Sequence, residues 1–397
     1  MDSAVVTGLL LVVGWVLVSR RLSRWSVTAP IALLVAGYLL ARWGGVELDL
    51  RAEALKRLAE VTLVLVLFHD ASRVSIRDLR SDASLATRLL AIGLPLTIAA
   101  GALVAGLLFD GHSWWVFALV GAILAPTDAA LGASIMTEER IPARLRTLIN
   151  VESGLNDGLA TPFVLFFLAG TVIEEQGGST DRVLVDATVE LLIAVTVGVI
   201  VGGLGRRALV TARRSGWSER SLEPIAVLAL ALLSYFACVG VGGNGFVAAF
   251  VGGLAFKNAA AGTTEDEATL TEQVGTILGL AVWFSFGLLA FLLVPSITWE
   301  EVAYAVLSLT IVRMLPVALA LWRSGLAPRD VLLIGWLGPR GLASLVFAIL
   351  AVEALSEGDA ELVAGTVTMT VILSVIAHGL SAGPLARRYA PATAAPP

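Results

Sequence analysis

The feature that most constrains this chain is a series of long apolar runs that follow one another along its 397 residues. Hydrophobic residues make up 57% of the sequence and the mean hydropathy is +0.87, which is more apolar surface than one soluble core could bury. A helix needs roughly 17–25 mostly apolar residues to cross a bilayer. The sequence therefore predicts an all-α, multi-pass membrane protein embedded in the lipid bilayer.

Thirteen such runs can be placed, and each is a predicted span. They lie near 4–19, 28–42, 56–70, 84–108, 114–136, 146–173, 184–210, 222–240, 243–257, 270–294, 301–323, 329–353 and 361–384. The two runs at 28–42 and 243–257 are short, so we expect flanking residues, tilt or burial among neighbours to complete them.

Lysine and arginine gather in alternate connections between these spans. Of the 27 such residues, 20 fall in the loops after odd-numbered spans, at the span ends beside those loops or in the C-terminal segment, and only five in or beside the other loops. Cationic loops remain on the cytoplasmic side. We therefore expect an outside N-terminus and a cytoplasmic C-terminus in the inner (cell) membrane. The formal net charge of −5 gives no indication of nucleic-acid binding.

Two predicted spans contain a proline near their middle. Pro126 lies in "GAILAPTDAALGA" and Pro339 in "GWLGPRGLASLVF", 213 residues further on. The same shift also superposes the neighbouring spans, and the loop charges place the two blocks in opposite directions. Inverted repeats with a broken central helix are typical of secondary transporters, whose substrate binds where the breaks meet. We expect 84–173 and 301–384 to form such a core.

Ionisable side chains inside these spans are costly to bury and therefore mark function. Three of them are Glu152 in "NVESGLNDGLATPF", Arg313, and Arg340 beside the second proline. Arginine keeps its proton in proteins, so a carboxylate held against it stays charged and paired. We expect Glu152 to pair with Arg313, with Arg340 as the second choice.

Asp157 is then left without a permanent basic partner. In a site of low dielectric constant, such a carboxylate holds either a proton or a small hard cation. The neighbouring oxygen ligands suit a sodium-like ion: the Ser153 hydroxyl, the Asn156 amide and main-chain carbonyls such as that of Thr127. This competition predicts an electroneutral one-for-one antiport. The function expected is transport without a cofactor, and not enzyme catalysis.

Three motifs carry a resemblance to a known family. "APTDAA" at 125–130, "ESGLND" at 152–157 and "GPRGLAS" at 338–344, in this order, resemble the monovalent cation/proton antiporter superfamily, specifically its NhaP-type sodium/proton branch. The animal sodium/proton exchangers are related to this branch. The similarity spans essentially the whole chain. It implies an NhaA/NhaP-like fold, Na⁺ or Li⁺ or K⁺ exchanged for H⁺, and a homodimer whose core moves like an elevator.

The resemblance also implies roles for individual residues. Asp157 matches the aspartate that binds ion and proton, Asn156 the asparagine that marks electroneutral members, and Ser153 a cation ligand. Glu152 matches the acid that pairs with an arginine in the span of Arg313.

At the breaks, Thr127 and Asp128 match the threonine–aspartate pair where broken helices cross. The Asp128 carboxylate is expected to compensate the partial positive charge of the exposed helix N-termini. Arg340 matches the arginine of the second broken helix, facing a helix dipole or opposing acids. The spans in 1–70 and 184–294 are expected to supply the dimerisation scaffold and further core contacts, within one transporter unit over 1–397. Residues 385–397 are expected to form a short cytoplasmic tail, without the long regulatory tail of the animal exchangers.

One departure from the family pattern lies in "LVLFHDASRV", where His69 and Asp70 stand in place of a single acid. Histidine titrates near pH 6.5, so His69 is a candidate pH sensor, with an interfacial hydrogen bond as the alternative.

Other functions remain as alternatives. A K⁺/H⁺ antiporter of the same fold shares all of these features. An intramembrane aspartyl protease using Asp128 and Asp157 would want a glycine where "GLND" has Asn156, and a serine hydrolase built on Ser153 would need a base that this segment lacks. A passive cation channel fits inverted breaks less well than alternating access does.

Overall fold

The computed structural model describes residues 2–23, 27–44, 53–75, 79–128, 141–260 and 265–388, and within these ranges it contains helices and no strands. Seven described helical segments are long and apolar enough to cross a membrane, and four further apolar helices are shorter. The predicted class, an all-α membrane protein, is confirmed.

The first half of the described chain is built from helices separated by short connections. They are α1 (Asp2–Ser23), α2 (Ala29–Gly44), α3 (Glu53–Arg73), α4 (Leu79–Arg88), the π-helical η1 (Leu89–Gly93), α5 (Leu94–Leu108), α6 (Trp114–Ile123) and α8 (Ala143–Glu175).

The second half continues in the same way, with four short 3₁₀ helices in the connections. Its elements are η2 (Thr180–Arg182), α9 (Val183–Arg214), η3 (Arg220–Leu222), α10 (Glu223–Gly240), α11 (Gly245–Asn258), η4 (Glu265–Ala268), α12 (Thr269–Leu293), η5 (Val294–Ser296), α13 (Trp299–Leu309), α14 (Ile311–Ala320), α15 (Pro328–Trp336), α16 (Leu342–Ala354) and α17 (Glu357–Arg388).

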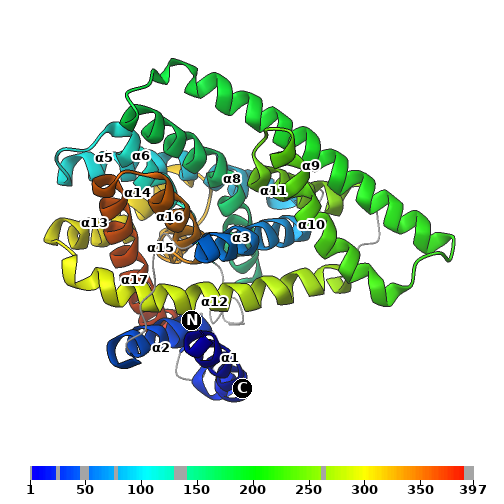
Figure 1. Cartoon of the computed structure of the whole chain (residues 1–397), viewed down its shortest axis with the longest axis horizontal. Coiled ribbons are helices and arrows are strands. Elements are labelled where there is room, and N and C mark those ends of the chain that lie inside the picture. Colours follow the sequence, from blue (N-terminus) through cyan, green and yellow to red (C-terminus); the bar gives the residue numbers. More distant parts are fainter. Residues whose placement is uncertain are drawn as a thin grey trace.

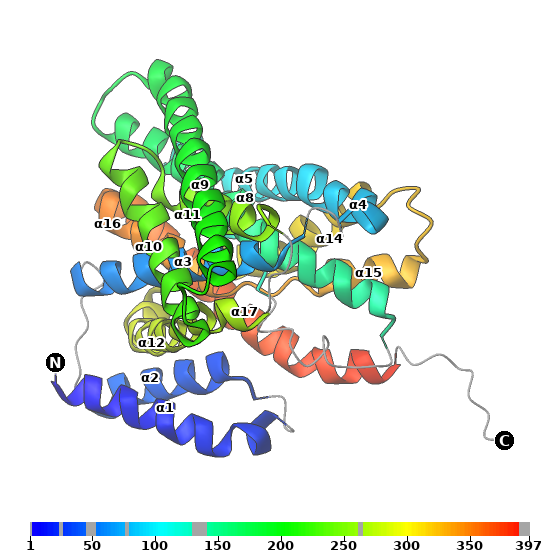
Figure 2. The same cartoon turned by 90° about the vertical axis from the view of Figure 1, so that its right-hand side faces the viewer.

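The helices group into two sides around a buried centre (Figure 1). On one side α9, α10 and α11 pack together and α11 lies against α3, while on the other α5 contacts α6, α13 and α14. The long helix α12 packs on both α3 and α2. In both views α1 and α2 lie beyond α12 as a peripheral pair (Figure 2).

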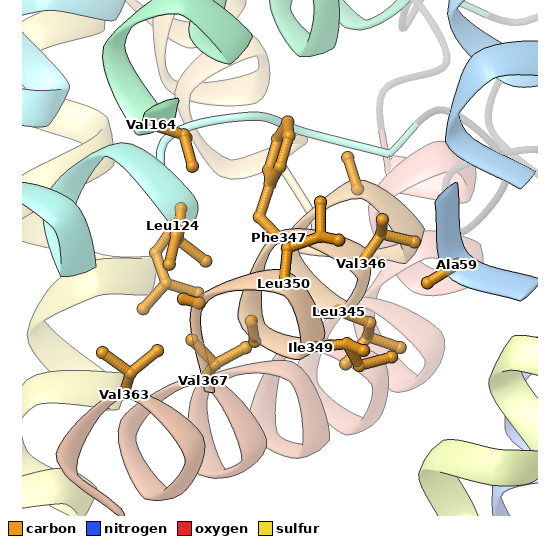
Figure 3. Close-up of a cluster of buried hydrophobic side chains, with 14 of the residues drawn as sticks. Ala59, Leu124, Val164, Leu345, Val346, Phe347, Ile349, Leu350, Val363 and Val367 are labelled. Carbon is orange, nitrogen blue, oxygen red and sulfur yellow. The ribbon is translucent and has the colours of Figure 1, made fainter. Parts of the chain in front are cut away.

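Helix α16 lies at the centre of the apolar core. All ten of its residues from Ala343 to Val352 are buried, so no stripe of this helix faces lipid. It packs against α3, α6, α8, α12 and α17. Figure 3 shows this arrangement, with Phe347 and Leu350 among the side chains of Leu124, Val164 and Val363. A helix that is apolar on every side is suited to complete burial among other helices.

The pairing of α2 with α12 depends on two facing glycines. A Cβ atom at Gly37 would lie 2.2 Å from the carbonyl oxygen of Phe284, and one at Gly287 would lie 2.2 Å from that of Leu34. Within a membrane, small residues allow two backbones to approach closely and gain dispersion contacts. The short predicted span at 28–42 is thereby held against a long neighbour.

Both predicted breaks occur in the described structure. In the span 114–136, α6 ends at Ile123 and the backbone up to Asp128 is not helical; residues 129–140 lie outside the described residues. The span 329–353 is divided into α15 and α16 by a non-helical stretch at 337–341. These are the positions of Pro126 and Pro339, which can neither donate a helical hydrogen bond nor fit the preceding turn.

Three other details differ from the expectation. The span 301–323 is divided at Thr310 into α13 and α14, and the span 84–108 runs from the end of α4 through the π-helical η1 into α5. Helix α17 continues to Arg388, so the first residues of the expected tail are helical, and 389–397 lie outside the described residues. The number of thirteen crossings stays a prediction.

Candidate functional site

The two interrupted helices meet through their main chains. The backbone N–H of Asp128 donates to the carbonyl oxygen of Pro339 at 2.8 Å, and the N–H of Leu342 donates to Oδ2 of Asp128 at 3.0 Å. Leu342 is the first residue of α16, so the Asp128 carboxylate lies at the positive end of that helix dipole. The first break is thus joined to the second.

Arg340 makes the reciprocal contact. Its side chain is fully buried, and Nη1 donates to the carbonyl oxygens of Ala125 at 2.7 Å and Pro126 at 3.1 Å. These carbonyls follow the C-terminal end of α6, where unpaired carbonyl groups and a partial negative charge remain. The positive guanidinium therefore compensates the end of the first interrupted helix.

The carboxylate of Glu152 is paired with Arg313. The two guanidinium nitrogens Nη1 and Nη2 donate to Oε1 at 3.0 Å and to Oε2 at 2.9 Å, and each residue is only 2% exposed. This bidentate geometry is the strong form of a buried ion pair. Glu152 is on α8 and Arg313 on α14, so the pair joins a helix of each expected repeat.

A cluster of uncharged polar side chains lies next to this pair. Nδ2 of Asn156 donates to Oγ1 of Thr127 at 2.6 Å, and the hydroxyls of Thr127 and Ser153 are 3.0 Å apart. All three side chains are buried, and Oδ1 of Asn156 has no hydrogen-bond partner among the described residues. The sequence pointed to the main-chain carbonyl of Thr127; the structure also brings its hydroxyl into the cluster.

Asp157 lines a cavity of about 910 Å³. Its side chain is 8% exposed, and its Oδ1 atom is buried without a hydrogen-bond partner among the described residues. Thr127, Asp128 and Ser153 also line this cavity, as does Asp70. The cavity therefore brings an acceptor oxygen of Asp157 together with hydroxyls and further carboxylates.

Part of the cavity wall comes from helix ends. Arg73 lies at the end of α3, Arg144 near the start of α8, and Glu272 in the first turn of α12. His69 is also on the wall, and its Nε2 atom lies 4.0 Å from Oε2 of Glu272. Glu272 is a wall residue that the sequence pattern does not predict. The only indication in the sequence is that Glu272 is an acidic residue within the first turn of the predicted span 270–294.

The fold and this site define a class: a multi-pass helical membrane protein in which two interrupted helices cross beside buried acids. The chain matches the family model described as sodium/hydrogen exchanger, transmembrane, over residues 8–388. It belongs to the sodium/hydrogen exchanger family, a family of integral membrane transporters.

Individual relatives agree with this family. The chain is 28% identical over 379 residues to the K(+)/H(+) antiporter NhaP of Alkalimonas amylolytica, covering 91% of this chain and 62% of that protein. It is 26% identical over 398 residues to the K(+)/H(+) antiporter NhaP2 of Shewanella sp. strain MR-4, covering 97% of this chain and 67% of the relative. The chain thus spans about two thirds of the length of these relatives.

A solved structure shares the fold. The sodium proton antiporter MjNhaP1 from Methanocaldococcus jannaschii at pH 8 superposes with a TM-score of 0.80, covering 96% of this chain and 99% of that one at 19% identity. The predicted NhaP-like fold and the resemblance to NhaP-type antiporters are confirmed.

Proposed function

We propose that this chain exchanges an alkali cation for H⁺ across the cell membrane, with Asp157 binding the two competitively. This proposal rests on how the groups around Asp157 are compensated. Glu152 is neutralised by Arg313, and Asp128 accepts a hydrogen bond at the start of α16. Asp157 instead lines the cavity and has a buried oxygen without a hydrogen-bond partner among the described residues, so its charge is the one that a mobile ion can compensate.

The neighbouring oxygens supply a cation shell. The hydroxyls of Ser153 and Thr127 lie 3.0 Å apart on the cavity wall, and Oδ1 of Asn156 is an open acceptor. Hydroxyl, amide and carboxylate oxygens are ligands of hard cations. A proton on Asp157 removes the charge that the cation needs. One H⁺ therefore replaces one cation, and the cycle is electroneutral.

Alternating access requires the site to open to one side at a time. The cavity wall reaches Arg73, Arg144 and Glu272, which lie at the helix ends assigned to the cytoplasm by the loop charges. At the opposite ends, Lys56 contacts Glu353 at 2.6 Å and His112 contacts Asp359 at 2.5 Å. This arrangement corresponds to an inward-facing state, with the N-terminus outside and the C-terminus cytoplasmic.

The moving core in this proposal consists of the inverted repeats 84–173 and 301–384, which contribute Glu152, Asp157, Arg313 and Arg340. The remaining helices form the scaffold of a homodimer. His69 and Asp70 lie on the cavity wall, where they contribute to attracting cations and to the response to pH. Na⁺ and K⁺ are both candidate substrates, because the relatives named above are K(+)/H(+) antiporters and the solved structure is a sodium proton antiporter.

The test is an exchange assay in vesicles that contain the purified protein and a pH-sensitive dye. Addition of Na⁺, K⁺ or Li⁺ should drive proton movement for at least one cation. Asp157→Asn should abolish this movement while the protein remains folded, and the exposed Glu357→Gln should not change it. Exchange that survives in Asp157→Asn would remove Asp157 from its role, and cation flux without proton movement would indicate a channel.

A further inference from the structure

A row of polar residues on α17 faces the second break. Ser374, His378 and Ser381 are spaced i, i+4 and i+7, so they share one face of the helix. None of them contacts the candidate cation ligands through a described hydrogen bond. Each instead bonds to the end of α15 or to the stretch between α15 and α16.

His378 holds the end of α15. Its Nε2 atom lies 2.8 Å from the carbonyl oxygen of Trp336, the last residue of that helix. A carbonyl oxygen can only accept, so this hydrogen bond requires a proton on Nε2. The imidazole stacks on the indole ring of Trp336 at 5.2 Å, and the indole Nε1 donates to Oγ of Ser381 at 2.9 Å. The orientation of the buried imidazole is therefore fixed on two sides.

Ser374 holds the other side of the break. Its Oγ accepts a hydrogen bond from the backbone N–H of Arg340 at 2.7 Å. On its own helix, His378 Nδ1 lies 2.8 Å from the carbonyl oxygen of Ser374. An interrupted helix leaves carbonyl and N–H groups that must be satisfied by protein within a membrane. One turn of α17 thus satisfies a carbonyl before the break and an N–H within it.

We infer that Ser374 and His378 are positioning residues that set the shape of the second break and, through it, the cation site. The inference rests on the proposed function. The route is short: Ser374 holds the main chain of Arg340, whose guanidinium contacts the carbonyls of Ala125 and Pro126, directly before Thr127 and Asp128. A shift of the break therefore displaces the oxygen ligands contributed by the first interrupted helix.

The side chain at residue 378 needs one N–H donor at the position of Nε2, within hydrogen-bond distance of the Trp336 carbonyl oxygen. The neutral imidazole protonated at Nε2 and the imidazolium both supply it. Glutamine carries an amide N–H₂ at a similar distance from the backbone, so His378→Gln should preserve the bond to Trp336. His378→Leu keeps the bulk and removes the donor.

Deuterium exchange of backbone amides in the purified protein tests the clamp directly. His378→Leu and Ser374→Ala should accelerate exchange in the peptide that covers 336–342, and His378→Gln should restore the wild-type rate. Thr370→Val is the matched control, because the Thr370 hydroxyl bonds only to the Thr366 carbonyl of the same helix among the described hydrogen bonds. Unchanged exchange in His378→Leu would overturn the inference.

The effect on the cation site is read from the KM for the exchanged cation in vesicles. Misplacement of binding groups by about 1 Å can cost up to roughly 100-fold, so we expect the KM of His378→Leu to rise at least about tenfold and His378→Gln to restore it. A role in folding alone would lower the amount of active protein at unchanged KM, and this result would contradict the inference. If the wild type exchanged no alkali cation, the proposed function would fail, while the amide exchange would still decide whether the clamp exists.

Discussion

At the scale of single residues, the buried charges around the breaks differ in what compensates them. Glu152 and Arg313 compensate each other, Asp128 accepts from the start of α16, and Arg340 donates to carbonyls after α6. Asp157 contributes an oxygen without a hydrogen-bond partner among the described residues. The first four groups have protein partners in the structure, whereas Asp157 lines the cavity.

Loss of Arg313 should chiefly affect stability. Arg313→Ala leaves the Glu152 carboxylate buried without its partner, a change that costs about 3–5 kcal/mol when buried ion pairs are broken. The thermal midpoint of the purified protein should fall, and Arg214→Ala, which removes an exposed arginine, should leave it unchanged. Removing both charges with Glu152→Gln and Arg313→Met should recover part of the loss. An Arg313→Ala protein as stable as Arg214→Ala would show that Glu152 is stabilised by other groups.

At the scale of elements, the sequence predicts features that have a local cause. The two breaks are visible because proline cannot continue a helix, and the Glu152–Arg313 contact could be anticipated because a buried carboxylate needs a cation. The division at Thr310 has no glycine or proline to announce it. There the Thr310 hydroxyl donates to the carbonyl of Val306 at 2.7 Å, which is a contact that the sequence pattern does not reveal.

The residues of the cavity wall could be predicted only in part, because some of them come from segments that are distant in the sequence. Asp157, Ser153 and Asn156 are near one another in sequence on one helix. Glu272, in contrast, comes from α12 and reaches the cavity only through the packing of α12 on α3. The roles of Ser374 and His378 likewise depend on which helix lies beside the second break. Contacts between distant segments can be identified only from the structure. Helical periodicity shows which residues share one face of a helix, but not which other helix packs against that face.

The crossing of the breaks leaves no room at Gly341. A Cβ atom there would lie 2.0 Å from Oδ2 of Asp128. Gly341→Ala should therefore push Asp128 away from α16 and lower the exchange rate by at least about tenfold, because ligand placement depends on this crossing. Gly203→Ala is the matched control, since a Cβ at that helical position meets nothing within 4 Å. Normal exchange in Gly341→Ala, measured at equal protein content, would contradict the described crossing.

At the scale of the whole molecule, the cavity and the ion pair between Lys56 and Glu353 lie toward opposite ends of the helices. The cavity reaches helix ends that carry Arg73 and Arg144, while Lys56 and Glu353 bridge α3 and α16 at the opposite ends. In the proposed transport cycle, this arrangement alternates with one in which the cavity is open at the opposite ends of the helices. The bridge between α3 and α16 connects the expected scaffold to the expected core.

The proposed stoichiometry has an electrical consequence. Moving one net charge across the membrane is worth about 2.3 kcal/mol per 100 mV, whereas exchange of one cation for one proton moves none. The rate of sodium-driven proton movement should therefore be insensitive to a potential that is imposed with a potassium gradient and valinomycin. A rate that changes several-fold with the sign of the potential would require unequal numbers of protons and cations.

The central claim is that Asp157 holds either a proton or an alkali cation. The most direct measurement is the release of protons from the purified protein, in weakly buffered solution with a pH-sensitive dye, when the transported cation is added. We expect one proton to be released for each cation bound, at a pH where the site is protonated, and no release from Asp157→Asn. Cation binding without proton release in the wild type, or equal release from Asp157→Asn, would contradict it.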